Sequence, residues 1–150
     1  MRARIATGVI LFLGAAGMVA AARAAEGYTP PGKDAFLKSI HDYPFVADAG
    51  RRARVRAAVP QLARCMPSTE VRKLLGDPDF GYVAYQAGTD GKVPQMRIWH
   101  YVLEKKAATE EVPGSRVVVW FDNSGKLNAV TVHGAPDIEA TVSRRAGRCD

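Results

Sequence analysis

The chain carries three histidines, the side chains that most often ligate metals or transfer protons near neutral pH. They are His41, His100 and His133, and no two of them form the close helical pair that metal motifs such as H-x-x-x-H use. His41 follows a short predicted helix, whose dipole favours a cation at that end. His100 lies between Trp99 and Tyr101, and His133 closes a predicted strand. The histidine spacing therefore predicts neither a metal site nor a cofactor.

The sequence shows no nucleophile in a catalytic setting and no clear acid–base pair. The serines lack the strand–turn–helix context of a nucleophile elbow. Asp77 and Asp79 are close carboxylates, but they flank Pro78 and are typical of turn residues. We therefore expect no catalytic residues and a protein that is not an enzyme.

The first residues are typical of a secretory signal peptide. Arg2 and Arg4 precede an uncharged apolar run over residues 5–22. Small residues then lead to a cleavage site after Ala24 or Ala25. A retained membrane anchor is the alternative, although the run is rich in Ala and Gly and weakly hydrophobic. No cysteine lies near the cut, so we expect an exported protein, periplasmic or secreted, without a lipid anchor.

Two cysteines, Cys65 and Cys149, follow the predicted signal peptide. In an oxidising compartment an even pair predicts one disulfide, and two free thiols are the alternative. The bond would tie the C-terminus to the centre of the chain. Closing so long a loop would stabilise the fold by about 4–5 kcal/mol in the chain-entropy model.

The charge balance is mildly basic, with 21 Lys and Arg against 15 Asp and Glu. Three arginines leave with the signal peptide, so the net charge falls from +6 to +3. This excess does not indicate a nucleic-acid partner, but it is compatible with an anionic lipid or a cell-wall polymer surface. The arginine cluster within residues 51–56 is a candidate for such contacts, or else a solvated helix face.

Helical periodicity fills the first half of the mature chain. A flexible Pro/Gly-rich lead-in is predicted over residues 25–33, followed by a single domain over residues 34–150. Asp34 and Asp48 are positioned to cap two helical segments, and Pro60 is expected to divide the second.

The stretch STEVRKLLGDPD, residues 68–79, predicts a third, short helix with its own stop signal. Ser68 is the expected N-cap, and Val71, Leu74 and Leu75 are expected to face inward. Gly76 can adopt the left-handed angles of a helix end, and the following proline prevents continuation.

After this helix the apolar period changes from near four to two. Asp90-Gly91 and Gly125 mark the turns of two hairpins, and a last short helix is expected from Pro136. Helices followed by a meander indicate an α+β fold. We predict N-terminal helices packed on one face of a three- to four-stranded antiparallel meander, as a two-layer sandwich.

Alternation along the last two strands separates a core face from an outer face. The expected core positions are Val117, Val119, Phe121, Val130 and Val132, and the expected outer positions are Arg116, Val118, Trp120, Thr131 and His133. An exposed aromatic with a nearby guanidinium is a common recognition anchor. We therefore name Arg116, Trp120 and His133 as candidate binding residues. The strand with Trp99 and Tyr101 is apolar on both faces, so its orientation stays open.

Three segments in this order resemble the SmpA/OmlA (BamE) family of outer-membrane assembly lipoproteins. They are CMPSTEVRKLLGDP at residues 65–78, WHY at residues 99–101 and VWFDNSGK at residues 119–126, so the resemblance covers about residues 65–133. It implies a helical hairpin on a three-stranded antiparallel sheet. The chain departs from the family pattern where Cys65 replaces glycine and Pro67 replaces the capping threonine. The lipidation cysteine is absent, and the hairpin at Asp90 has the character of an insertion.

The sequence leads to three functional hypotheses. The first is a non-enzymatic periplasmic or secreted binding module that docks on an envelope protein through an open sheet face, as the resemblance implies. The second is a secreted inhibitor of a hydrolase, which would use the protruding loop at residues 87–93. The third is a small hydrolase or metalloprotein that depends on His100 or His133.

Overall fold

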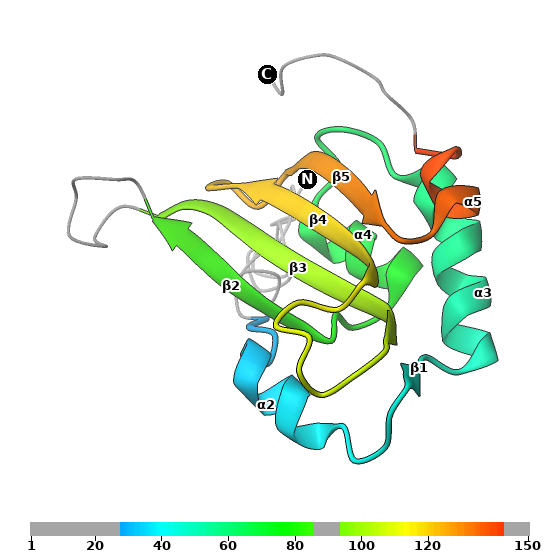
Figure 1. Ribbon diagram of the computed structural model, residues 1–150. Coiled ribbons are helices and arrows are strands. Elements are labelled where there is room, and N and C mark those ends of the chain that lie inside the picture. Colours follow the sequence, from blue (N-terminus) through cyan, green and yellow to red (C-terminus); the bar gives the residue numbers. More distant parts are fainter. Residues whose placement is uncertain (1–27, 86–93, 143–150) are drawn as a thin grey trace, which may run out of the picture.

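The computed structural model describes residues 28–85 and 94–142, and within them five strands form one antiparallel sheet (Figure 1). The strands are β1 (Phe45–Val46), β2 (Phe80–Tyr85), β3 (Pro94–Lys105), β4 (Ser115–Asp122) and β5 (Leu127–His133). The last four follow one another as a meander, and the short β1 pairs with the far end of β3. The predicted α+β class and its antiparallel meander are confirmed.

The helices are α2 (Lys33–Ser39), α3 (Ala49–Ala58), the 3-10 turn η1 (Val59–Gln61), α4 (Ser68–Leu75) and α5 (Pro136–Glu139). The Asp48 side chain caps α3 by accepting from the Arg51 N–H, as expected. The prediction for Ser68 was wrong, because Pro67 occupies the N-cap position and no side chain caps α4. Gly76 ends α4 at a φ of 84°, which confirms the stop signal.

The main hydrophobic core lies between the sheet and the pair α3–α4. Val71 and Leu75 of α4 are fully buried against Val117, Val119 and Phe121 of β4. The core also fixes the orientation of β3, which the sequence left open. Trp99, Tyr101 and Leu103 all point toward these helices. We call this surface of the sheet the helix face and the opposite surface the outer face.

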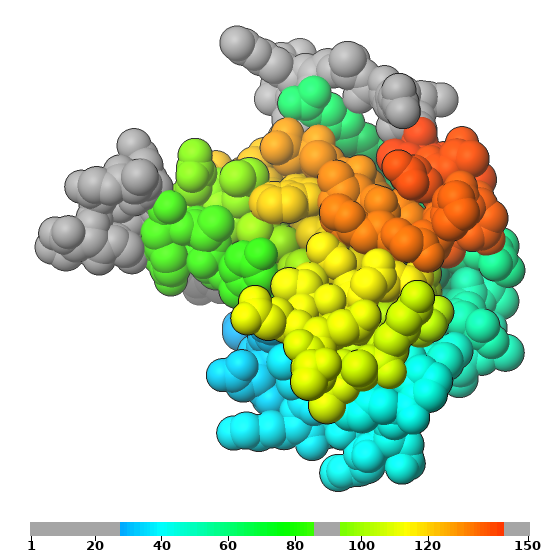
Figure 2. Space-filling model, in the orientation of Figure 1, coloured from blue at the N-terminus to red at the C-terminus, as the bar shows by residue number. Residues whose placement is uncertain are grey.

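The outer face is partly covered, which corrects the expectation that all N-terminal helices lie on one face. Phe36 of α2 packs against Phe80 and Val102, and these three residues form a second, smaller cluster. The segment between β3 and β4, in yellow in Figures 1 and 2, lies beside α2 over the same side of the molecule. The open area predicted for this face is therefore limited to the part near β2, β4 and β5.

Two of the three segments that carry the family resemblance, residues 65–78 and 119–126, come together at the start of α4. Cys65 N–H donates to Leu127 C=O at 2.8 Å, and Ser68 N–H donates to Gly125 C=O at 2.9 Å. Cys65 has a φ of 70°, in the left-handed region that favours glycine, which is the residue of the family pattern at this position. These motif residues thus build the join between helix and hairpin.

The described residues contain no free cysteine, so Cys65 is not a free thiol. Its predicted partner, Cys149, lies outside the described residues, as does the predicted cleavage site at Ala24 and Ala25. The Cys65–Cys149 disulfide and the signal peptide therefore stay predictions.

Candidate functional site

Strand register brings the three candidate binding residues to one hollow on the outer face. Arg116 pairs with His133 across β4 and β5, and Trp120 follows four residues after Arg116 on the same face of β4. The hollow has a volume of about 440 Å³. It is lined by Lys33, Phe80, Tyr82, His100, Val112, Arg116, Val118, Trp120 and His133. The face that the sequence assigned to binding is thus concave, with a wall that α2 contributes.

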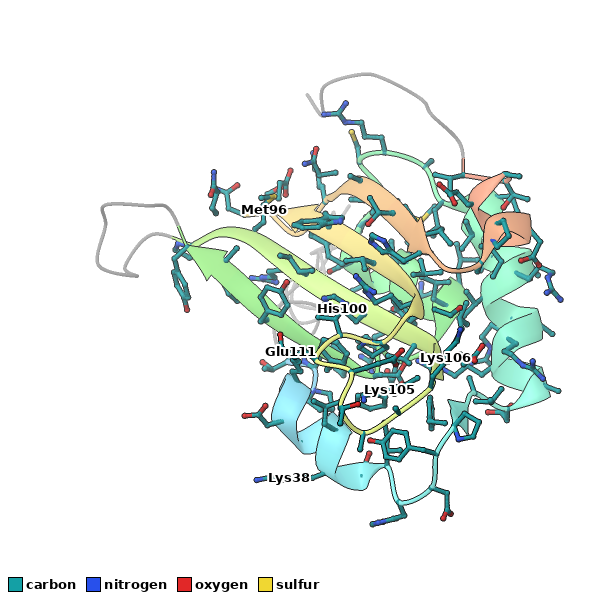
Figure 3. The ribbon with its side chains drawn as sticks, viewed as in Figure 1. Lys38, Met96, His100, Lys105, Lys106 and Glu111 are labelled. Atoms are coloured by element: carbon teal, nitrogen blue, oxygen red, sulfur yellow. The ribbon has the colours of Figure 1, made fainter. Side chains whose placement is uncertain are left out.

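His100 lies on the wall of this hollow, on β3 near the middle of the sheet (Figure 3). Its side chain is only 6% exposed, and it stacks on Phe80 at 4.3 Å and on Tyr82 at 5.6 Å between ring centroids. Both ring nitrogens are buried without a hydrogen-bond partner. Burial, together with the nearby Arg116, His133 and Lys33, lowers the pKa of His100 to about 4. His100 is therefore neutral at pH 7, with two unused polar atoms.

Arg116 is the second group with an unused polar atom. Its Nη1 donates to the Pro113 carbonyl, which anchors the segment that covers part of the outer face. Its Nε is buried and has no partner. No carboxylate of the described residues pairs with this guanidinium, and burial lowers its pKa. A half-buried cation without a counter-ion is a costly arrangement that a bound anion would relieve.

Trp120 and His133 form the more accessible rim of the hollow. The Trp120 Nε1–H donates to Thr131 Oγ1 at 3.2 Å, which orients the indole across the neighbouring strand. His133 is exposed, and its pKa is lowered by burial and by Arg116, with Glu139 acting in the opposite direction. The rim thus offers an apolar ring and a polar group to an incoming ligand.

The segment that walls the hollow is held by side-chain contacts to its own backbone. Lys105, which is 1% exposed, donates from Nζ to the carbonyls of Ala107 and Ala108. Glu110 accepts from the Lys106 N–H at 2.9 Å through its Oε2. These bonds lie at both sides of the turn, so the wall is supported by the residues that flank it.

The helix face carries a second polar cluster, in which the charges are paired. Asp79 Oδ2 accepts from Arg51 Nη2 at 2.7 Å and from the Val102 N–H at 2.6 Å. Tyr101 Oη donates to the Gly76 carbonyl at 3.1 Å. Burial raises the pKa of Asp79, and Arg51 opposes that shift. This cluster joins α3, the end of α4 and β3, so its role is structural. Asp79 contributes more than the turn role predicted for it.

The arginine cluster of α3 is divided between structure and surface. Arg51 binds Asp79, and Arg56 forms an exposed ion pair with Asp137 at 2.7 Å. Arg52 and Arg54 are exposed. Two of the four arginines that the sequence suggested for contact with an anionic surface therefore form ion pairs within the protein.

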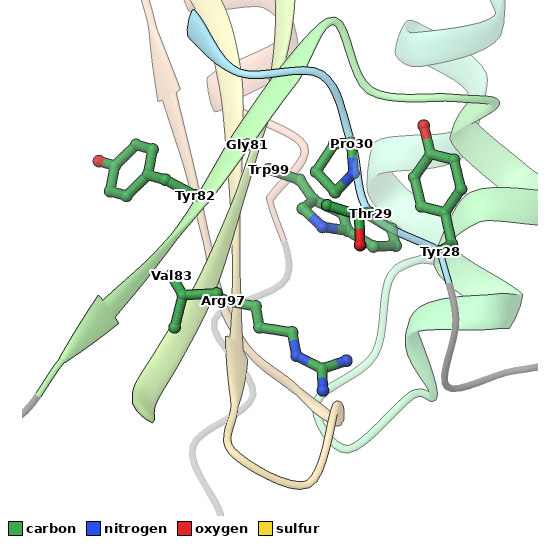
Figure 4. A pocket seen from close by; sticks show the side chains of 8 residues that line it. All are labelled: Tyr28, Thr29, Pro30, Gly81, Tyr82, Val83, Arg97 and Trp99. Atoms are coloured by element: carbon green, nitrogen blue, oxygen red, sulfur yellow. The ribbon is translucent and has the colours of Figure 1, made fainter. Parts of the chain in front are cut away.

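A smaller cavity of about 220 Å³ lies where the lead-in crosses the edge of the sheet (Figure 4). Tyr28 packs edge-on against Trp99 at 5.7 Å, and the Arg72 guanidinium lies 3.8 Å over the Tyr28 ring. Gly81 N–H donates to Pro31 C=O, and a Cβ at Gly81 would lie 2.5 Å from Pro30. Within the lead-in predicted over residues 25–33, the described part from Tyr28 onward therefore contacts the sheet.

The structure brings together all three predicted binding residues and adds others that the sequence did not single out. His100 was considered only as an isolated histidine, and Lys33 and Phe80 were not considered for the site. The turn residues 87–93, on which the inhibitor hypothesis depends, lie outside the described residues. Among the described residues, no group of three or more His, Cys, Asp or Glu is placed to hold a metal ion.

Comparisons with family models, with curated proteins and with solved structures give no match for this chain. In the described part of the chain, no helix has the length and apolar character needed to cross a bilayer.

Proposed function

We propose that this chain is a non-enzymatic binding module of the cell envelope, which docks on an envelope protein through the outer face of its sheet. The N-terminal signal pattern supports an exported location, and the resemblance to SmpA/OmlA proteins supports a role in protein assembly at the envelope. The uncovered part of the outer face, near β2, β4 and β5, is the docking surface in this proposal.

One observation carries the proposal. Arg116, Trp120 and His133 share a hollow with His100, whose nitrogens lack partners in the free protein. Buried polar groups in native proteins are nearly always satisfied, and those that are not tend to mark a functional site. An aromatic ring and a guanidinium at the rim are also the residue types that dominate binding energy at protein interfaces.

The proposal is tested by capture of partners from an envelope extract on the immobilised mature chain. We expect Trp120→Ala and Arg116→Ala to lose the partner that the wild type retains. Arg52→Ala is the matched control, because Arg52 is an exposed arginine on α3, on the far side of the sheet. Capture that is reduced by Arg52→Ala and unchanged by the two outer-face variants would reject this docking surface.

A further inference from the structure

We propose that the outer-face hollow binds a carboxylate that is attached to an apolar group, with the carboxylate held by Arg116 and His100. This inference deepens the docking role and rests on it, because it names the chemical group by which the partner is recognised. The carboxylate belongs to the partner polypeptide, and a free small acid in the same hollow is the other outcome that the test distinguishes.

The hollow contains polar atoms that have no hydrogen-bond partner in the free protein. His100 offers two ring nitrogens and Arg116 offers its Nε, and all three atoms are buried without partners. His100 and Arg116 lie on neighbouring strands, where Val102 and His100 of β3 pair with Arg116 and Val118 of β4. A carboxylate has two oxygens that accept in one plane, so one group can accept from both side chains.

The charge around the hollow is positive. Its lining includes Lys33, Arg116 and His133, and it includes no Asp or Glu. Lys33 comes from α2 and Arg116 from β4, so the two cations approach from different elements, and His133 of β5 adds a polar ring. A site in which charges of one sign converge on a concave surface favours a ligand of the opposite sign.

The apolar walls of the hollow favour an anion with a single charge and an apolar body. Phe80, Val118 and the ring of Trp120 make much of the wall apolar. Since His100 is neutral at pH 7, the half-buried cations beside it are Arg116 and Lys33. Against these apolar walls, a phosphate dianion costs more to desolvate than a singly charged carboxylate. A singly charged carboxylate on an apolar body matches both the charge and the walls.

Access to His100 depends on Tyr82. The Tyr82 ring stacks on His100 and is itself 50% exposed, so it has room to rotate toward solvent. Such a rotation would open the imidazole to the hollow without moving the backbone of β2.

The test is a titration of the mature protein with 3-phenylpropionate, followed by calorimetry and by the NMR signals of the His100 ring. We expect a dissociation constant of the order of millimolar, as is usual for a ligand of this size. The amide analogue, 3-phenylpropanamide, should bind at least tenfold more weakly. Equal binding of the amide, or tighter binding of phenyl phosphate than of the acid, would overturn the inference.

Substitutions of the lining residues show which side chains contact the carboxylate. Arg116→Lys keeps the charge but loses the planar fork, and His100→Phe keeps the stacking but loses the nitrogens. Each variant should bind 3-phenylpropionate about fivefold to tenfold more weakly than the wild type. Lys33→Ala should weaken binding of 3-phenylpropionate by less, about twofold to threefold. Lys38→Ala is the matched control, because Lys38 is exposed on the same helix and does not line the hollow. Affinities that match the wild type in Arg116→Lys and His100→Phe would contradict the assignment.

A second arm separates the two sources of the carboxylate. A short peptide that ends in a free phenylalanine carboxylate should bind more tightly than 3-phenylpropionate if the group belongs to a polypeptide, and its C-terminal amide should not bind. If the small acid binds while no envelope protein is captured, the site stands and the docking role fails. If a partner is captured equally by wild type, Arg116→Lys and His100→Phe, the docking role stands and this site fails.

Discussion

The two faces of the sheet differ in whether their buried charges are paired within the protein. On the helix face, Asp79 is bound by Arg51 and by the Val102 N–H, and Tyr101 donates to a carbonyl. On the outer face, His100 and Arg116 keep buried nitrogens without partners. The same sheet therefore carries one surface whose buried charges are paired within the protein, although Arg51 Nε has no partner, and one surface where His100 and Arg116 have no paired charge.

The difference indicates which face holds the fold together and which one is free to bind. An unsatisfied buried donor or acceptor costs about 1–3 kcal/mol, and a paired network costs far less. Among the described residues the helix face carries that cost only at Arg51 Nε, and its charges are paired, so its polar residues are part of the architecture. The outer face carries the cost in the free protein, where a ligand can remove it on binding.

The largest expected effect comes from removing the Arg51–Asp79 ion pair on the helix face. Asp79→Ala leaves Arg51 without its carboxylate and Val102 N–H without an acceptor, so we expect a loss of about 3–5 kcal/mol in the free energy of unfolding by urea. Asp77→Ala is the control within the same turn, because its ion pair with Arg72 is largely exposed. It should cost less than about 1 kcal/mol. Similar losses in the two variants would mean that the Asp79 network is not structural.

The next effect is a pH dependence that originates on the outer face. The pKa of His100 is about 4 in the folded protein and near 6.5 when unfolded, so the unfolded state binds the extra proton between these values. The contribution of His100 to stability therefore becomes less favourable as the pH is lowered below 6.5, by about 2 kcal/mol between pH 7 and pH 5. Denaturant unfolding at the two pH values measures this loss.

The variant His100→Phe isolates that contribution. Lys33, Tyr82, Arg116 and His133 all face His100 and stay in place, and the raised pKa of Asp79, which acts in the opposite direction, is common to both proteins. The variant should lose about 2 kcal/mol less than the wild type between pH 7 and pH 5. Equal losses would show that His100 is not the group that titrates.

At neutral pH, the stability of His100→Phe shows whether the imidazole contributes to the fold. Phenylalanine keeps the stacking on Phe80 and removes two unsatisfied nitrogens, so we expect the free energy of unfolding at pH 7 to stay the same or to rise by about 1 kcal/mol. Thermal unfolding of the pure protein gives this value. A loss of more than about 1 kcal/mol would mean that the imidazole supports the fold.

The smallest effect is expected at the rim. Thr131→Val removes the acceptor of Trp120 Nε1 at an exposed position of β5, where valine is a good strand residue. Stability should change by less than about 0.5 kcal/mol, as is usual for surface positions. Capture of the envelope partner should weaken, because the indole loses its fixed orientation. Unchanged capture would remove Thr131 from the account of the site.

Local signals predicted most of the fold. Asp48 capped its helix, Pro60 divided the second helical segment, and Gly125 formed the last turn with a φ of 78°. Alternation placed Arg116, Trp120 and His133 on one face, because strand period depends only on neighbours in sequence. Each of these features is decided within a few residues.

The rest depends on contacts between distant parts of the chain. The strand around Trp99 is apolar on both sides, so its sequence could not show that His100 points outward beside Arg116. The position of α2 over the outer face depends on Phe36 meeting Phe80, more than forty residues later. That tertiary contact turned a flat face into a hollow, and no local pattern in either segment specifies it.

Photo-cross-linking in an envelope fraction tests most directly whether the outer face is the binding face. A photoreactive phenylalanine derivative is placed either at Trp120, on the rim of the hollow, or at Arg52, on the exposed surface of α3. The account predicts a cross-linked partner from position 120 and none from position 52. A cross-link from position 52 with none from position 120 would contradict it.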